Sequence, residues 1–305
     1  MSEFNLHGFD LFGEAIKPKN QGIVASRFTF PPFTILDAKQ GDWQERKREW
    51  ISLGIKSEEG RENGATFGGG LGVKFENGEE SRTSIFDPVV CELMYSWFSA
   101  KNSQIIDPFA GGSVRGIVAG ALGRKYWGCD LRQDQVTENQ KQKNDLFPES
   151  DVEWVCGDSA IKMEDAPIGD FLFSCPPYGD LEVYSDGLDD LSNMTHEQFV
   201  VAYKSIIKKS VSRLKNDRFA AFVVGDFRDK KGFYRNFVSE TINAFEDSGA
   251  RLYNEAILAT SVGSASMRVS KQFNSGRKFA KTHQNILVFC KGDWRKATDF
   301  VNCEN

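Results

Sequence analysis

The sequence is poor in residues that bind metals or form cross-links. Histidine occurs only at positions 7, 196 and 283, and the six cysteines are scattered with no C-x-x-C pair. These spacings exclude a zinc-ligand cluster and favour reduced, mostly buried thiols, as in a cytoplasmic protein without a metal. No apolar run is long enough to span a membrane, and the first residues lack the basic-then-apolar pattern of a signal peptide.

Net charge is also small, −5 over 305 residues, which argues against indiscriminate coating of nucleic acid. The distribution is nevertheless uneven, because the serine- and glycine-containing stretch 260–284 has no acidic residue. Its basic residues are Arg268, Lys271, Arg277, Lys278 and Lys281. This stretch is predicted to be a loop, and either a solvated surface or contact with nucleic-acid phosphates would explain its charge.

A glycine-rich turn joins a predicted strand at 104–107 to a predicted helix at 114–122. It consists of Asp107, Pro108, Phe109, Ala110, Gly111, Gly112 and Ser113. Strand, glycine-rich turn and helix form the nucleotide-binding corner of open α/β sheets. No Lys-Ser or Lys-Thr follows, which excludes a P-loop, and the leading Asp107 would repel a phosphate but attract an ammonium group. The turn therefore predicts a cationic ligand that carries an amino acid.

A second turn follows the apolar run 170–173 and contains two prolines. It consists of Ser174, Cys175, Pro176, Pro177 and Tyr178. Two prolines at the end of a strand force a rigid turn outside the sheet, which exposes the preceding carbonyls beside the tyrosine ring. Carbonyl acceptors next to an aromatic ring suit a planar amine.

From residue 81 onward, strand-like runs alternate with helical patterns, which predicts a Rossmann-like, mostly parallel α/β sheet with helices on both faces. Strands are predicted at 104–107, 125–130, 152–158, 171–174, 219–226, 251–259 and 285–291, and helices at 87–99, 196–214 and 233–248. Residues 1–80 are predicted to form an irregular N-terminal arm with a helix at 42–50. Residues 81–295 would form the main domain and 296–305 a C-terminal tail.

The order Asp-Pro-Phe-Ala-Gly-Gly and then Pro-Pro-Tyr resembles S-adenosylmethionine-dependent DNA amino-methyltransferases, which modify N6 of adenine or N4 of cytosine. The stretches 84–88, 180–185 and 282–289 are similar to phage and prophage DNA methylases, including those of restriction-modification systems. The resemblance covers residues 80–295. It implies a seven-stranded sheet, S-adenosylmethionine as cofactor, DNA as partner, and DNA contacts within 227–284.

The resemblance also implies roles for single residues. Residues 107–113 would bind the cofactor, with Asp130 accepting from its ribose hydroxyls and Asp158 from its adenine amino group. Each acid could instead cap a helix. Ser84 and Phe86 would close over the methionine end. The turn 174–178 would act on the target amine, with Tyr178 stacked on a base extruded from the duplex.

Cys175 departs from the family, which has Asp, Asn or Ser at that position. Because a thiol is a poor hydrogen-bond partner, either backbone carbonyls accept the amine hydrogens, or activity is weak, or the protein is a non-catalytic remnant. A cysteine nucleophile for methylation at cytosine C5 would follow a proline, whereas Cys175 precedes two. The missing Asp favours N4-cytosine. Methylation of RNA or of protein glutamine stays an alternative, and both a monomer and a homodimer are open.

Overall fold

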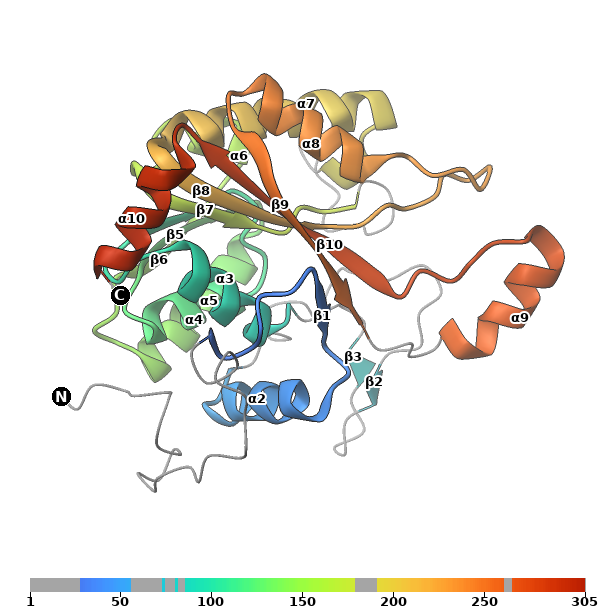
Figure 1. Cartoon of the computed structure of the whole chain (residues 1–305), viewed down its shortest axis with the longest axis horizontal. Coiled ribbons are helices and arrows are strands. Elements are labelled where there is room, and N and C mark those ends of the chain that lie inside the picture. The colour runs from blue at the N-terminus through green and yellow to red at the C-terminus, as the bar shows by residue number, and fades with distance from the viewer. Residues whose placement is uncertain are drawn as a thin grey trace. The chain divides into compact units, whose positions relative to one another are not determined.

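The computed structural model describes residues 28–55, 73–74, 80–81, 86–178, 191–260 and 265–304. The chain divides into two compact units, 1–33 and 34–305, and the second holds every strand of the main sheet. That sheet has eight strands in the order β1-β9-β10-β8-β7-β4-β5-β6 (Figure 1). The Rossmann-like, mostly parallel α/β fold predicted from the sequence is confirmed.

The strands of the main sheet are β1 (Ile35–Asp37), β4 (Gln104–Asp107), β5 (Lys125–Asp130), β6 (Val152–Cys156), β7 (Gly169–Ser174), β8 (Leu214–Val224), β9 (Arg251–Ala259) and β10 (His283–Lys291). β10 runs antiparallel to both of its neighbours, β8 and β9. β7 lies near the middle and is buried along its whole length, which explains why it reads as a continuous apolar run. A separate antiparallel pair consists of β2 (Val73–Lys74) and β3 (Glu80–Ser81).

Helices cover both faces of the sheet. They are α2 (Gly41–Ser52), α3 (Pro88–Phe98), α4 (Val114–Ala121), α5 (Gln133–Leu146), α6 (Ser159–Lys162), α7 (His196–Arg213), α8 (Phe237–Asp247), α9 (Ala265–Gly276) and α10 (Trp294–Glu304), with a 3-10 turn at Leu191–Asn193. In Figure 1, α7 and α8 lie above the sheet and α3 and α4 below it. The main core is rich in aromatic rings, among them Tyr203, Phe222, Phe237 and Phe289.

The eighth strand and a packed helix come from the segment predicted to be an irregular arm. β1 pairs in parallel with β9, with Ile35 opposite Ile257, and so covers an edge that would otherwise expose unpaired backbone groups. α2, which confirms the helix predicted at 42–50, packs on α3. There the fully buried Glu92 accepts hydrogen bonds from Trp50 Nε1 at 2.7 Å and Arg46 Nη2 at 2.6 Å. The compact unit that holds the main sheet thus includes α2 and begins at Thr34.

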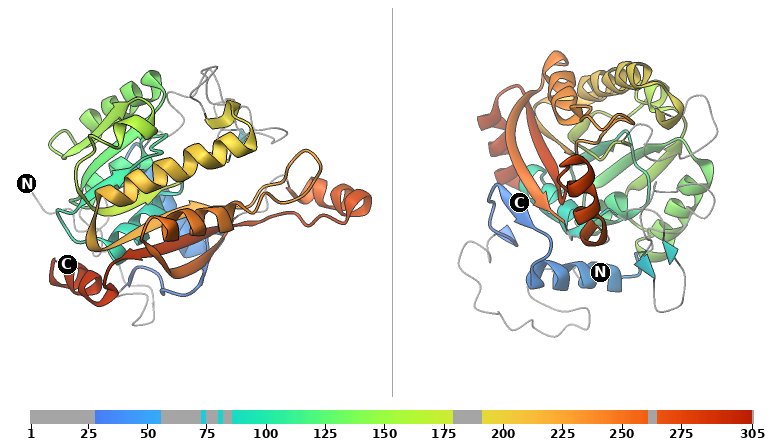
Figure 2. Two further views of the ribbon diagram at one scale, coloured as in Figure 1. Left: turned by 90° about the horizontal axis from the view of Figure 1, so that it is seen from above. Right: turned by 90° about the vertical axis from the view of Figure 1, so that its right-hand side faces the viewer.

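Two further segments differ from the prediction. α10 (Trp294–Glu304) includes residues of the predicted tail 296–305, and it packs against β8 and α3 with Ala297 and Val301 buried. Residues 265–276, expected as a loop, form α9, which stands away from the sheet in Figure 1 and in the left view of Figure 2. Val269 and Phe273 lie one helical turn apart, but the serines around them obscure this spacing in the sequence.

One edge of the sheet collects the turns singled out by the sequence. The parallel strands β4 to β8 end there. β10 begins at the same edge, since Asn285 lies opposite Val224, and β9 ends there, since Ala259 lies opposite His283. Ligands of open α/β sheets bind outside the carboxyl ends of the strands, so this edge is the candidate site.

Candidate functional site

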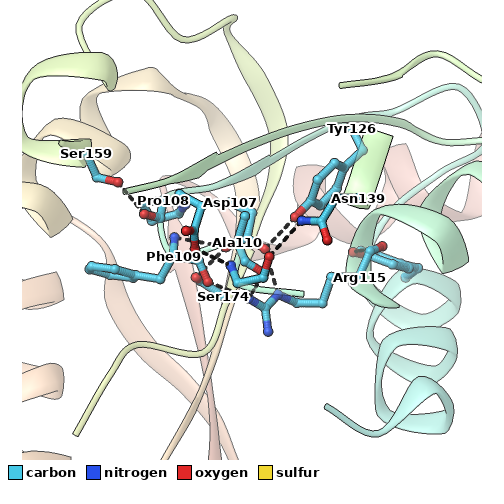
Figure 3. Close-up of polar contacts among 12 residues, drawn as sticks. Asp107, Pro108, Phe109, Ala110, Arg115, Tyr126, Asn139, Ser159 and Ser174 are labelled. Atoms are coloured by element: carbon cyan, nitrogen blue, oxygen red, sulfur yellow. Dashed lines mark hydrogen bonds and ion pairs between the residues drawn. The ribbon is translucent and has the colours of Figure 1, made fainter. Parts of the chain in front are cut away.

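Asp107, the last residue of β4, is fully buried and accepts four hydrogen bonds (Figure 3). The donors are Arg115 Nε at 2.6 Å, the Tyr126 hydroxyl at 2.7 Å, the Ser174 hydroxyl at 2.5 Å and the Phe109 N–H at 3.1 Å. Its charge is thus compensated inside the protein, whereas the sequence suggested that it would attract an ammonium group of the ligand. Asp107 instead connects the ends of β4 and β7 to Tyr126, near the start of β5, and to Arg115 of α4.

Arg115, from the first turn of α4, supports the backbone of the glycine-rich turn. Its Nη2 donates to the carbonyl oxygens of Phe109 and, at 2.8 Å, Ala110. Burial by itself lowers the pKa of Arg115, but Asp107, together with Tyr126 and Cys175, raises it above its usual value, so the guanidinium stays charged. Sequence reasoning missed this residue, although an arginine just inside a helix that follows a glycine turn is a readable signal.

Phe86 packs beside Arg115. Its ring centre lies 4.7 Å from the Arg115 guanidinium carbon, and it meets the ring of Phe173 edge-on at 5.8 Å. The structure therefore places the Phe86 ring beside Arg115, the residue that supports the glycine-rich turn, and its predicted role at the methionine end of the cofactor stays a prediction. Ser84 lies outside the described residues.

Buried amide side chains on α5 hold the glycine-rich turn from the other side. Gly111 has φ +53°, a left-handed conformation that favours glycine, and its carbonyl oxygen accepts from Asn139 Nδ2 at 2.7 Å. The Ser113 hydroxyl donates to Gln142 Oε1 at 3.0 Å. Asn139 and Gln142 were not predicted. Amides three residues apart on a polar helix share one face, which was the available signal.

The two acids predicted to contact the nucleoside end neighbouring strands. Asp130 is the last residue of β5 and lies opposite Cys156 in β6. Its carboxylate accepts a hydrogen bond from the backbone N–H of Gly111 at 2.9 Å. Asp158 follows β6 and caps α6, with Oδ1 accepting from the Ala160 N–H at 2.8 Å. Asp158 therefore caps a helix, which was the predicted alternative to a contact with the adenine amino group of the cofactor. Both carboxylates lie at the same edge as the glycine-rich turn.

The proline turn is anchored at both of its ends. Ser174 is buried and bonded to Asp107, and Tyr178 is half-buried. The Tyr178 ring meets Phe227 and Phe237 edge-on, with centroids 6.1 and 6.0 Å away. Its hydroxyl oxygen accepts from Gln284 Nε2 at 2.7 Å. Cys175 and Pro177 between them are half-buried, and Pro176 is buried.

Lys281 lies beside the proline turn. It is not part of α9, the helix of the same basic segment that stands away from the sheet. A β-carbon at Gly225 would lie 3.4 Å from Lys281 Cε, 3.7 Å from the Tyr178 hydroxyl and 3.9 Å from Gln284 Cγ. Burial lowers the pKa of Lys281, against an opposing effect of Asp226. A lysine was predicted here to meet phosphate, and the structure places it where the proline turn meets the start of β10.

The other four predicted basic residues are farther along the same segment. Arg268 and Lys271 belong to α9, and Lys271 and Arg277 are exposed. Lys278 is half-buried against the backbone of Gly232.

None of the described helices is both long enough and apolar enough to cross a bilayer. Over the same described ranges, no three His, Cys, Asp or Glu side chains gather into a group that could hold a metal ion.

No protein-family model matches the chain. It is 27% identical over 117 residues to the type II methyltransferase M2.LlaDCHI of Lactococcus lactis subsp. cremoris, covering 38% of this chain and 44% of that protein. It is 26% identical over 170 residues to the tRNA (guanine(10)-N2)-dimethyltransferase of Pyrococcus abyssi, covering 52% and 49%. The chain thus spans about half the length of these curated relatives.

Among solved structures, TrmN from Thermus thermophilus is similar with a TM-score of 0.46 and 13% identity over 68% of this chain and 49% of that one. Of the two sequence matches, one is to a protein named for tRNA and the other to a protein whose name specifies no nucleic acid, so together they do not separate DNA from RNA. Together with the sheet order, these two sequence matches support the methyltransferase superfamily for this chain.

Proposed function

We propose that the protein transfers a methyl group from S-adenosylmethionine to an exocyclic amino group of a base in DNA, with N4 of cytosine favoured over N6 of adenine. The observation that carries this proposal is the shared carboxylate of Asp107, which accepts from Ser174 of the proline turn and from Phe109 of the glycine-rich turn. A donor bound at one turn and an amine at the other would be neighbours. Such proximity supplies much of the rate of a transfer reaction.

The glycine-rich turn suits a nucleoside that carries an amino acid. Residues 107–113 would hold it, since Gly111 adopts a left-handed conformation that lets backbone approach a ligand closely. Asp130 and Asp158 end adjacent strands and supply acceptors for ribose hydroxyls and an adenine amino group. When bound, the cofactor supplies a methyl group on a positively charged sulfonium.

The proline turn would activate the amine. An exocyclic amine is a poor nucleophile because its lone pair is delocalised into the base. The carbonyl oxygens of Ser174 and Cys175 accept its two N–H bonds and favour a pyramidal nitrogen, an effect of preorganised acceptors. The Ser174 hydroxyl is directed at Asp107, so the backbone takes the role that a side-chain oxygen has in the family.

The tyrosine and the basic segment would hold the DNA. Tyr178, fixed by Gln284, provides a ring on which an extruded base stacks. Lys281 lies beside it, and the remaining basic residues contact phosphates. They are Arg268, Lys271, Arg277 and Lys278.

The test is incubation with methyl-labelled cofactor and duplex DNA, RNA or protein, followed by mass spectrometry of the nucleosides. Label in DNA as N4-methylcytosine is the expected result. Asp130→Ala should abolish cofactor binding, whereas Asp151→Ala, at an exposed acid, should leave it unchanged. Bound cofactor with no turnover on any acceptor would refute the proposal and favour a remnant.

A second candidate is methylation of a base amino group in RNA. It is favoured by the match to the tRNA dimethyltransferase, which covers a larger share of this chain than the match to the type II enzyme. Label found in RNA and absent from DNA would establish it.

A further inference from the structure

A second exposed segment is the hairpin of residues 228–234, closed by a bridge between Arg228 and Tyr234. It directly follows Phe227, whose ring contacts Tyr178 of the proline turn. Its backbone is held internally, since Asp229 N–H donates to the Phe233 carbonyl at 2.9 Å and Phe233 N–H donates back to Asp229 Oδ1 at 2.9 Å. Phe233 is nevertheless 72% exposed. The hairpin thus presents an aromatic ring on an ordered backbone, which reduces the entropy lost when a ligand binds.

The hairpin adjoins the segment 265–281. The Lys278 ammonium lies directly against Gly232, where it leaves no room for a β-carbon. Within the segment, Arg277 lies 5.2 Å from the ring of Phe273, and Phe273 stacks on Phe279 with centroids 5.9 Å apart. Phe279 is 76% exposed. Exposed rings of the hairpin and exposed rings of the segment 265–281 therefore lie on either side of the contact between Lys278 and Gly232.

Both parts also carry positive charge. The hairpin and its flanks hold Arg228, Lys230, Lys231 and Arg235 against Asp226 and Asp229, and the segment 265–281 has no acid. Arg228 lies 3.9 Å from the centre of the Tyr234 ring, so cations and rings alternate here. This pattern matches a polyanion whose flat base faces are accessible. A duplex hides those faces in its stack and offers mainly phosphates and groove edges.

We infer that the hairpin 228–234 and the segment 265–281 form one surface that binds an unpaired nucleic-acid strand, with bases stacked on Phe233 and Phe279. The inference rests on the proposed function, because that function makes the proline turn, at the same edge of the sheet, the place to which the bound strand leads. An enzyme that acts on a base amine needs that base outside the stack, and an unpaired strand meets this need without the cost of extrusion.

The experiment compares the full chain with the variant Phe233→Leu/Phe279→Leu, which keeps apolar volume but removes both rings. Fluorescence polarisation measures binding of labelled oligothymidylate, oligouridylate and a mixed-sequence duplex at one salt concentration. Affinity for oligothymidylate should fall roughly five- to 150-fold per ring, while affinity for the duplex stays the same. Trp294→Leu, at an exposed ring on α10, is the matched control and should change neither.

An equal loss on single strand and duplex, or no loss on either, would overturn the inference. A larger loss on oligouridylate than on oligothymidylate supports it and identifies RNA as the strand. Methyl transfer is assayed on the same proteins. Selective loss of strand binding in a protein without transferase activity would overturn the proposed function alone, and active transferase with unchanged strand binding would overturn this inference alone.

Discussion

Gln284 at the start of β10 donates a 2.7 Å hydrogen bond to the hydroxyl oxygen of Tyr178, 106 residues earlier in the chain. The bond spans the edge of the sheet, because β8 lies between β10, which carries Gln284, and β7, which the proline turn follows. Gly225, the residue after β8, has no side chain and leaves room for this bond. The orientation of the tyrosine ring is thus set by a strand that sequence reasoning did not connect with the site.

We expect Gln284→Leu and Tyr178→Phe each to reduce kcat/KM for methyl transfer about fivefold, the value of one hydrogen bond of about 1 kcal/mol. Because both changes remove the same bond, the double variant should be no worse than either single one. Cofactor affinity, measured by calorimetry, should not change. A double variant that shows the product of the two losses would contradict this coupling.

Arg115→Met should lower the free energy of unfolding by about 3–5 kcal/mol, because it leaves the buried Asp107 carboxylate without its counter-charge. Urea denaturation measures this loss. The control is Lys125→Met, which removes an exposed ion pair with Asp151 and should cost about 0–1 kcal/mol. Similar losses in the two variants would show that Asp107 does not depend on Arg115.

Gly116→Ala should destabilise the protein by about 1–3 kcal/mol, since the added methyl group would collide with the Trp154 indole and lie 3.0 Å from Tyr126 Cε1. Cofactor affinity should fall as well, because Tyr126 donates to Asp107. Thermal unfolding and calorimetry test the two effects. Gly41→Ala is the control, because no atom lies within 4 Å of its new β-carbon and stability should be kept.

Burial raises the pKa of the Cys129 thiol from 9.0 to about 12, so the folded state retains a proton that the unfolded chain loses. The stability contributed by this thiol is complete below pH 9 and is lost as pH rises from there to the folded pKa. Between pH ~8 and ~10, the wild type should lose about 1.4 kcal/mol more than Cys129→Ala. Parallel losses in urea denaturation at the two pH values would contradict the raised pKa.

Cys175→Ala tests whether the side chain before the two prolines takes part in methyl transfer. If backbone carbonyls accept the amine hydrogens, kcat should stay within about threefold of the wild type, since no acceptor is lost. A loss approaching 100-fold, the usual effect of removing one preorganised group, would show that the thiol participates. Single-turnover methyl transfer is the appropriate measurement.

Strands 104–107, 125–130 and 251–259 were predicted to the residue, because a local run that contains apolar side chains ends at Asp107, Asp130 and Ala259. β1 was not, since three residues carry little pattern and their pairing with β9 is a contact far along the chain. α9 escaped prediction because its described side chains are exposed, so that it has no buried stripe to create a helical period.

By itself, the sequence determined the α/β class, the two turns and the residue types available to them, since proline, glycine and apolar spacing act on neighbouring backbone. Only the tertiary structure decided how those residues are used. Asp107 could have faced a ligand, but the neighbouring β4, β5 and β7 bring Tyr126 and Ser174 to it, and Arg115 neutralises it. A carboxylate excluded from water binds the donors that the fold places around it, and a one-dimensional pattern does not contain that placement.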